Sequence, residues 1–396
     1  VNITGANGTT TLTYTKAYEI KLSSSGESLP TWDGATDEEK QSITQVVFEE
    51  SFNTAKVKTC YMWFKGFKNL VAIKGIKNLN TSEVTCMGYM FYNFNNLTSI
   101  TFGDNFNTSS VTNMRSMFNN CSKLTSLTFG DNFNTSSVTN MLSMFNGCSS
   151  LTSLDLSKFN TTSVTTMANM FEGCQGLTSI TFGDNFNTEK VTKMTSMFYN
   201  CKGLTSLDFS KFNTSNVDYM LSMFYNCSSL TSLDLSNFNT EKVTTMANMF
   251  YGCSKLASLT FGDNFNTSSV KNMNNMFNGC SSLRLLDLSK ATSLNFSNMI
   301  GSISNRPLTY VPTGTAGTSD RENVVVGNEC AHLVINYGAT PNNQLLLSAP
   351  YGFTAQKITI NRKFTKDKPY TLCLPFAVTN TATYGAFYKY SDYNDG

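Results

Sequence analysis

The chain has 396 residues, of which 29 are basic and 27 acidic, giving a formal net charge of +2. This balance does not favour nucleic acid or an anionic membrane as a partner, and 40% hydrophobic residues argue against bulk disorder. The single histidine, His332, excludes a multi-histidine metal site and leaves at most one catalytic imidazole. The longest apolar runs have about four residues, so we expect no membrane-spanning segment.

The N-terminal segment, residues 1–42, precedes a repeat array. Its first residues, VNITGANG, lack an initiator methionine and the basic and apolar parts of a leader peptide. We therefore expect a mature or trimmed chain that carries no export signal or anchor. A strand is predicted at 11–15, followed by a polar run with Pro30 and Gly34. Because the open end of a repeat array exposes core and strand edge, this segment is predicted to be an N-terminal cap.

Internal repeats occupy residues 43–300. The unit Met-x-x-Met-Phe-x-x-Cys-x-x-Leu-x-x-Leu recurs every 26 or 27 residues. This period is typical of a solenoid, in which each unit is one coil and only a stack of coils buries a core. The phenylalanine of the unit falls at Phe91, Phe118, Phe145, Phe171, Phe198, Phe224, Phe250 and Phe277.

Each unit combines two hydrophobic periods. Residues 124–129 alternate as a short strand. A stripe typical of a short helix follows Thr108, Ser109 and Ser110, which are suitable helix caps. The pattern predicts a right-handed leucine-rich-repeat solenoid with a parallel sheet on one face and short helices on the other. The helical stripe consists of Val111, Met114, Met117, Phe118 and Cys121.

The unit at 230–256, LTSLDLSNFNTEKVTTMANMFYGCSKL, resembles the repeat of BspA-like leucine-rich-repeat surface proteins of the Bacteroidetes type. The resemblance spans the array. It implies a cell-surface or secreted adhesin that binds host matrix proteins, glycans or other cells.

The C-terminal part loses the repeat. Residues 301–317 are predicted to be a linker because they contain prolines and glycines, and 318–396 are predicted to be an antiparallel β module. The run LCLPF at 372–376 is similar to a segment that follows the repeats in some BspA-like proteins.

Three residue columns are predicted to be structural. The cysteine column is interpreted as buried free thiols, because Phe67 and Phe94 occupy the same slot in earlier units. The phenylalanine and asparagine columns are interpreted as core and as turn-capping residues. Whether Cys60 and Cys86 form a disulfide stays open. The columns are Cys121, Cys148, Cys174, Cys201, Cys227, Cys253 and Cys280; Phe106, Phe133, Phe159, Phe186, Phe212, Phe238 and Phe265; and Asn107, Asn134, Asn160, Asn187, Asn213, Asn239 and Asn266.

Two surfaces are candidate binding sites. The outward strand positions form a polar face, on which Asp208 and Asp234 are expected to be stacked neighbours that repel each other. A calcium ion would relieve this pair, or the turn pair Asp104 and Asp131. The alternative is a solvated sheet face. The outward positions are Ser99, Thr101, Ser126, Thr128, Ser153, Asp155, Ser179, Thr181, Ser206, Asp208, Ser232, Asp234, Ser258 and Thr260.

The second candidate is a tyrosine ladder. Tyr199, Tyr225 and Tyr251 occupy equivalent positions in consecutive units, and Tyr92 occupies the same position in an earlier unit. Such a ladder offers stacking surfaces for sugar rings or an anchor for a protein contact. The alternative is that each ring only covers its neighbouring coil.

No motif indicates catalysis. Cys330 and His332 would share one strand face, but no orienting group or oxyanion hole accompanies them, so core packing is the default. We expect no enzyme activity, no cofactor and no metal site, and a monomer. The sequence favours a non-enzymatic adhesin; the alternative is a rigid spacer that presents another domain at the cell surface.

Overall fold

The computed structural model describes about three quarters of the chain, including nearly all of the central array. The described residues are 2–5, 11–13, 21–22, 28–29, 36–48, 50, 53, 57–292, 294, 298–299, 307–315, 318, 321–337, 353–356 and 358–362. The LCLPF segment at 372–376 lies outside them.

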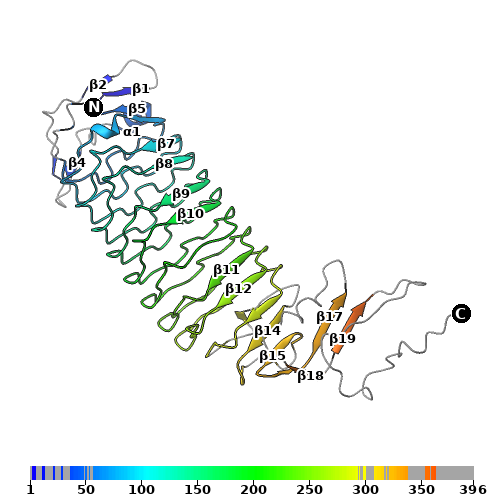
Figure 1. Cartoon of the computed structure of the whole chain (residues 1–396). Coiled ribbons are helices and arrows are strands. Elements are labelled where there is room, and N and C mark those ends of the chain that lie inside the picture. The colour runs from blue at the N-terminus through cyan, green and yellow to red at the C-terminus, as the bar shows by residue number, and fades with distance from the viewer. Residues whose placement is uncertain are drawn as a thin grey trace.

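The chain forms a β-solenoid of about 11 turns, as the repeat period predicts, and it contains little helix. Its coils stack into an elongated slab with the N-terminal elements at one end (Figure 1). The elements are β1 (Asn2–Gly5), β2 (Thr11–Thr13), β3 (Lys21–Leu22), β4 (Ser28–Leu29), α1 (Asp37–Ser42), β5 (Ile43–Val47), β6 (Ala72–Lys74), η3 (Ile76–Asn78), β7 (Ser99–Thr101), β8 (Ser126–Thr128), β9 (Ser153–Leu156), β10 (Ser179–Phe182), β11 (Ser232–Leu235), β12 (Ser258–Phe261), β13 (Leu285–Asp287), β14 (Leu308–Val311), β15 (Val324–Val326), β16 (Glu329–Cys330), β17 (Leu333–Tyr337), β18 (Thr354–Ala355) and β19 (Ile358–Arg362).

One side of the stack, the strand face, is formed by parallel strands from successive coils. Strands β7 and β8, β9 and β10, and β11 and β12 pair in parallel and in register. Ser179 lies opposite Ser153, and Thr181 opposite Asp155. Equivalent positions of the unit therefore form straight columns along the solenoid.

A second column of single parallel bridges runs along another side, the bridge face. It links one residue of each of nine consecutive coils. The residues are Thr59, Cys86, Asn113, Asn140, Thr166, Lys193, Tyr219, Thr245 and Asn272.

The third side, the turn face, contains overlapping turns where short helices are predicted. The amide of Met117 donates to the carbonyl of Met114 (3.2 Å), whereas the next amide, of Phe118, donates to the carbonyl of Met144 in the following coil (2.9 Å). In an α-helix, successive amides all donate to carbonyls of the same segment. Here some amides donate within the segment and others to the following coil, so the segment forms overlapping turns instead of a helix. The turn face consists of residues 60–67, 87–94, 114–121, 141–148, 167–174, 194–201, 220–227, 246–253 and 273–280.

Left-handed residues make these turns possible. Two positions of each turn segment have positive φ, for example 53° at Ser116 and 60° at Asn120. The second position, just before the cysteine slot, is always Asn or Gly, the residues that adopt this conformation at least cost. It is occupied by Gly66, Asn93, Asn120, Gly147, Gly173, Asn200, Asn226, Gly252 and Gly279.

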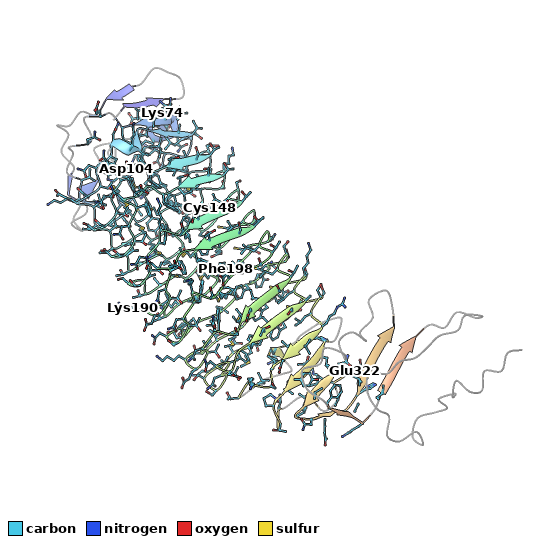
Figure 2. All side chains as sticks on the ribbon, in the orientation of Figure 1. Lys74, Asp104, Cys148, Lys190, Phe198 and Glu322 are labelled. Carbon is cyan, nitrogen blue, oxygen red and sulfur yellow. The ribbon has the colours of Figure 1, made fainter. Side chains whose placement is uncertain are left out.

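The core is a continuous set of apolar columns. The phenylalanine of the Met-Phe pair stacks on its equivalent in the next coil, as Phe118 does on Phe145 with ring centroids 5.5 Å apart. Phe212 and its column are at most 3% exposed, as predicted for core residues. Figure 2 shows Cys148 and Phe198 inside the stack, and Lys190 at its rim.

A buried threonine column, which the sequence reading missed, connects the coils at one corner. The hydroxyl of Thr188 donates to the carbonyl of Asn213 in the next coil (2.7 Å) and accepts from the amide of the same residue (2.8 Å). Thr108, predicted to be a helix cap, belongs to this column and donates to the carbonyl of Asn134. The column comprises Thr81, Thr108, Thr135, Thr161, Thr188, Thr214, Thr240 and Thr267.

The one-residue difference between units lies in the turn after the strand. Units with the longer turn carry a glycine there, and a Cβ at Gly183 would lie 1.9 Å from the carbonyl oxygen of Ser157. The longer turn therefore passes too close to the preceding coil for any side chain.

The ends of the array differ. At the N-terminal end, β1 pairs antiparallel with both β2 and β5, and β5 pairs in parallel with β6. At the other end, the predicted linker contains β14, which pairs in parallel with β13 and β15. The pairings beyond are mixed where antiparallel ones were predicted: β15 with β16 is antiparallel, whereas β16 with β18 and β17 with β19 are parallel.

Candidate binding surfaces

The strand face is a flat array of small polar side chains. Its outward Ser, Thr and Asp positions are exposed, as predicted, and the strand residues between them point into the core. At the strand-face corner, the hydroxyl of Thr178 donates to the carbonyl of Thr152 (2.8 Å). Such a surface has no aromatic anchor of the kind that dominates protein interfaces.

Asp208 and Asp234 cap the turns that follow their own strand positions. The Oδ1 of Asp208 accepts from the amide of Ser210 (2.8 Å), and that of Asp234 from the amide of Ser236 (2.9 Å). The amide and then the hydroxyl of Ser210 hold the pKa of Asp208 below its ordinary value. These bonds give both carboxylates a structural role within their own coils.

Three long-turn carboxylates pair with lysines, whereas the ion pairs of the described residues do not include Asp104. Asp131 pairs with Lys158 (2.6 Å), and Asp184 pairs with Lys211 (2.9 Å). In both pairs the aspartate of a long turn meets the lysine of the short turn in the next coil. Among the described residues, no group of three or more His, Cys, Asp or Glu side chains is arranged to hold a metal ion.

The asparagine column also has a structural role. The Oδ1 of Asn107 accepts from the amide of Ser109 (2.9 Å), and the same bond recurs at Asn213 with Ser215 (3.0 Å). This is the turn-capping role that the sequence predicts.

Tyr199, Tyr225 and Tyr251 form a stack on the turn face. The centroids of Tyr199 and Tyr225 are 4.6 Å apart with planes 10° from parallel, and those of Tyr225 and Tyr251 are 4.7 Å apart at 4°. All three side chains are partly exposed. Burial, and then the two neighbouring rings, raise the pKa of the Tyr225 phenol.

This stacking determines which parts of the tyrosine side chains are open to a ligand. Both faces of Tyr225 lie against neighbouring rings, so the stack presents ring edges and hydroxyls to solvent. A sugar ring that stacks on an aromatic face would find only the outer faces of Tyr199 and Tyr251. The geometry therefore favours a protein contact over a run of stacked sugars.

Tyr92 lies in a different cluster, several coils away from this stack. Its ring meets Tyr89 edge to face (5.4 Å), and Tyr89 meets Tyr61 in the same way (5.9 Å). The guanidinium carbon of Arg115 lies 5.6 Å from the centroid of Tyr89. The sequence reading missed Tyr61, Tyr89 and Arg115, although three tyrosines in two adjacent units were the available signal.

The cysteine column consists of buried free thiols, as predicted. The Sγ of Cys227 donates to the carbonyl of Phe198 (3.0 Å) in the preceding coil, and each thiol of the column makes the equivalent bond. Burial raises the pKa of Cys280 to about 12. Cys60 and Cys86 are not joined by a disulfide.

Cys330 and His332 do not form a nucleophile–base pair in this structure. Cys330 is buried beside Tyr310 and Leu333, and burial raises the pKa of its thiol to about 11. The Nε2 of His332 lies 2.9 Å from the hydroxyl of Thr359. A thiol nucleophile needs a lowered pKa, so these surroundings suit core packing.

Known structures of low identity resemble the chain. A leucine-rich repeat protein from Bacteroides ovatus is 16% identical, with a TM-score of 0.36 over 81% of this chain and 75% of that one. A leucine-rich cell surface protein from Faecalibacterium prausnitzii is 16% identical, with a TM-score of 0.38 over 89% and 95%. The functional domain of InlJ from Listeria monocytogenes, which includes a cysteine ladder, is 15% identical, with a TM-score of 0.19 over 78% and 77%.

No curated protein matches the chain. No helix among the described residues is long and apolar enough to cross a membrane. One family model matches three overlapping segments, 33–127, 92–181 and 178–290, which together cover about two thirds of the chain and nearly all of the array. The chain therefore belongs to the family described as the Mycoplasma protein of unknown function, DUF285.

Proposed function

We propose that this chain is a non-enzymatic adhesin, placed at the cell surface or secreted, that attaches to host matrix proteins, glycans or other cells through its repeat surface. The observation that carries the proposal is the stack of Tyr199, Tyr225 and Tyr251 on the turn face. The resemblance of the repeat to BspA-like surface proteins supports the same placement and role.

The stack has the properties of a protein-binding anchor. Tyrosine is enriched among residues that dominate binding energy. Since the three rings already hold each other in place, less side-chain entropy is lost when a partner binds. Leu221, on the same turn segment as Tyr225, is partly exposed and adds apolar area to the turn face. Host matrix proteins are therefore the first partners to test, ahead of glycans.

The chemistry of the described residues supports a binding role without catalysis. Seven column thiols lie in the core, and the Cys330 thiol is buried. The carboxylates of Asp208 and Asp234 are engaged by their own turns. We propose that the chain acts without a cofactor or metal, as a monomer.

A solid-phase binding panel tests the proposal. The purified chain is applied to fibronectin, fibrinogen, laminin, collagen, mucins and a glycan array, with and without Ca²⁺. We expect saturable binding to a matrix protein. The triple variant Tyr199→Ala/Tyr225→Ala/Tyr251→Ala should weaken this binding at least about tenfold, which corresponds to a loss of more than about 1.4 kcal/mol of binding free energy. Circular dichroism confirms that the variant folds.

Tyr219→Ala is the matched control, because Tyr219 is 42% exposed on the bridge face and its ring makes no contact with the rings of the stack. Equal losses of binding affinity in both variants would show that the stack is not part of the binding site. A panel without saturable binding would reject the adhesin.

The alternative function is a rigid spacer that presents another domain. It is favoured by the uninterrupted core and by the bridge column that links nine coils without a gap. Small-angle scattering that shows a rigid rod, together with a negative panel, would establish the spacer.

A further inference from the structure

A second aromatic cluster occupies the N-terminal end of the turn face, well separated in sequence from the tyrosine stack. It contains Tyr61, Tyr89 and Tyr92, linked by two edge-to-face contacts. Arg115, from the next coil, lies over the ring of Tyr89. The three rings are partly exposed, and Arg115 is exposed.

Positive charge gathers around this cluster. The turn segments of these three coils and the residues that flank them, 57–70, 84–97 and 111–124, contain five cationic side chains and no Asp or Glu. The equivalent segments of the next two coils, 138–151 and 164–177, contain no Lys or Arg, and Glu172 is their one charged residue. The cations are Lys58, Lys65, Lys68, Arg115 and Lys123, and all are exposed.

The acidic helix α1 lies beside these cations at one edge, where the Oδ1 of Asp37 is 4.0 Å from a Cβ built on Gly66. Lys65, Lys68 and Arg115 form no ion pair with any carboxylate among the described residues. The chain as a whole is close to neutral, so the cations of these turn segments make the potential locally positive, most clearly at Arg115 and Lys123, which lie in the coil farthest from α1. A locally positive surface raises the association rate of an acidic partner.

The rings are held in place before any partner arrives. Gly88 lies under Tyr61, since a Cβ there would lie 3.3 Å from the Tyr61 ring. Tyr89 is fixed between Tyr61, Tyr92 and the guanidinium of Arg115. A preorganised surface loses less side-chain entropy on binding.

We infer that the basic aromatic patch formed by Tyr61, Lys65, Lys68, Tyr89, Tyr92 and Arg115 docks an acidic peptide segment of a partner protein. The Arg115 guanidinium and the two lysines bind carboxylates, and the tyrosine edges pack against the peptide side chains. A peptide suits this patch better than a sugar chain, because the guanidinium and the edge-to-face contacts cover part of the ring faces. The inference goes beyond the proposed function, since it names a second site and the chemistry of its partner.

Fluorescence anisotropy of the full chain tests the inference. The probe is a fluorescein-labelled dodecapeptide rich in Glu and Asp with one central Tyr, titrated at several salt concentrations. We expect saturable binding that weakens as salt rises. The triple variant Lys65→Gln/Lys68→Gln/Arg115→Gln should raise the Kd at least about tenfold, and Tyr89→Ala about fivefold.

A matched control removes equal charge elsewhere. The variant Lys193→Gln/Lys202→Gln/Lys255→Gln loses three exposed cations from later coils and should change the Kd less than about twofold. Equal losses in the two triple variants, or no saturable binding, would overturn the inference. Unlabelled heparin that displaces the probe, combined with no effect of Tyr89→Ala, would show a general polyanion surface and also overturn it.

The readout is independent of the proposed adhesin surface. The Tyr199→Ala/Tyr225→Ala/Tyr251→Ala variant should bind the acidic peptide normally. A negative peptide assay therefore contradicts only the role of the basic aromatic patch. A negative matrix panel contradicts only the role of the tyrosine stack.

Discussion

The Oδ1 of Asp131 lies 2.6 Å from the Nζ of Lys158, which occupies the next coil. The same arrangement joins Asp184 to Lys211 and Asp263 to Lys290. In each pair a long turn is followed by a short one, so the alternation of turn lengths places opposite charges side by side along the rim of the solenoid.

These pairs predict a pH dependence. The hydrogen bond and charge of Lys158 lower the pKa of Asp131 from its ordinary value of 3.8, and Lys211 does the same for Asp184. Because the folded-state pKa lies below the unfolded-state value, each pair stabilises the fold above that value. The contribution is lost as the pH falls through the folded-state pKa. Both carboxylates are fully exposed, so we expect the effect to be small and to weaken in salt.

Carboxyl ¹³C NMR titration measures this directly. Lys158→Met should raise the pKa of Asp131 toward its ordinary value and leave Asp184 unchanged. Lys211→Met should raise the pKa of Asp184 and leave that of Asp131 unchanged. An unchanged Asp131 titration in Lys158→Met would show that the pair does not form in solution.

The phenylalanine core predicts a large loss of stability on truncation. Phe212 is 3% exposed and packs against Phe182 and Phe186 of the preceding coil. Phe212→Ala should lower the free energy of unfolding by about 3–5 kcal/mol, because it leaves a cavity between coils. Urea denaturation monitored by circular dichroism gives the value, and near-neutral stability would remove Phe212 from the core.

The buried threonine column predicts a loss that depends on position. Thr188→Val removes a hydroxyl that serves both the carbonyl and the amide of Asn213, and should cost about 1–3 kcal/mol. Thr178→Val removes an exposed hydroxyl with one bond to Thr152, and should cost less than about 0.5 kcal/mol. Equal unfolding midpoints in urea for the two variants would contradict the role of the column.

The cysteine column predicts unreactive thiols. Burial raises the pKa of Cys227 and Cys280, so at pH 8 the native chain should label slowly with a thiol reagent and rapidly once unfolded. Cys86 is the one described cysteine that is not fully buried, and it should react before the column. Mass spectrometry assigns the labelled positions, and early modification of several column thiols would contradict the buried core.

The sequence predicted the coils and their columns because each column repeats an apolar or turn-forming residue at the same place. It did not predict the backbone conformation of the turn face correctly. Residues such as Met114, Met117 and Cys121 line one side of a short helix and one side of overlapping turns equally well, so their spacing does not distinguish the two. The restriction to Asn or Gly before each cysteine slot was the signal for left-handed backbone.

The candidate binding surfaces were predicted only in part. The tyrosine positions are visible in the sequence, but their face-to-face contact is not, and that contact determines that edges rather than faces meet a ligand. The basic aromatic patch combines four different columns: Tyr61 with Arg115, Tyr89, Lys65 with Tyr92, and Lys68. Comparing residues at one position of the repeat unit at a time therefore does not reveal the patch.

The hydrogen bonds between coils run parallel to the long axis of the solenoid, and nearly all of them join adjacent coils, although the Asn105 side chain donates to that of Asn53 two coils away. A pulling force applied at the two ends therefore acts on one boundary at a time, peeling coils from an end instead of shearing the whole stack. Each released coil of 26 or 27 residues adds roughly 90 Å of extended chain. A tethered molecule of this kind would lengthen stepwise under load, absorbing mechanical work while the remaining coils, and the surfaces they carry, stay folded.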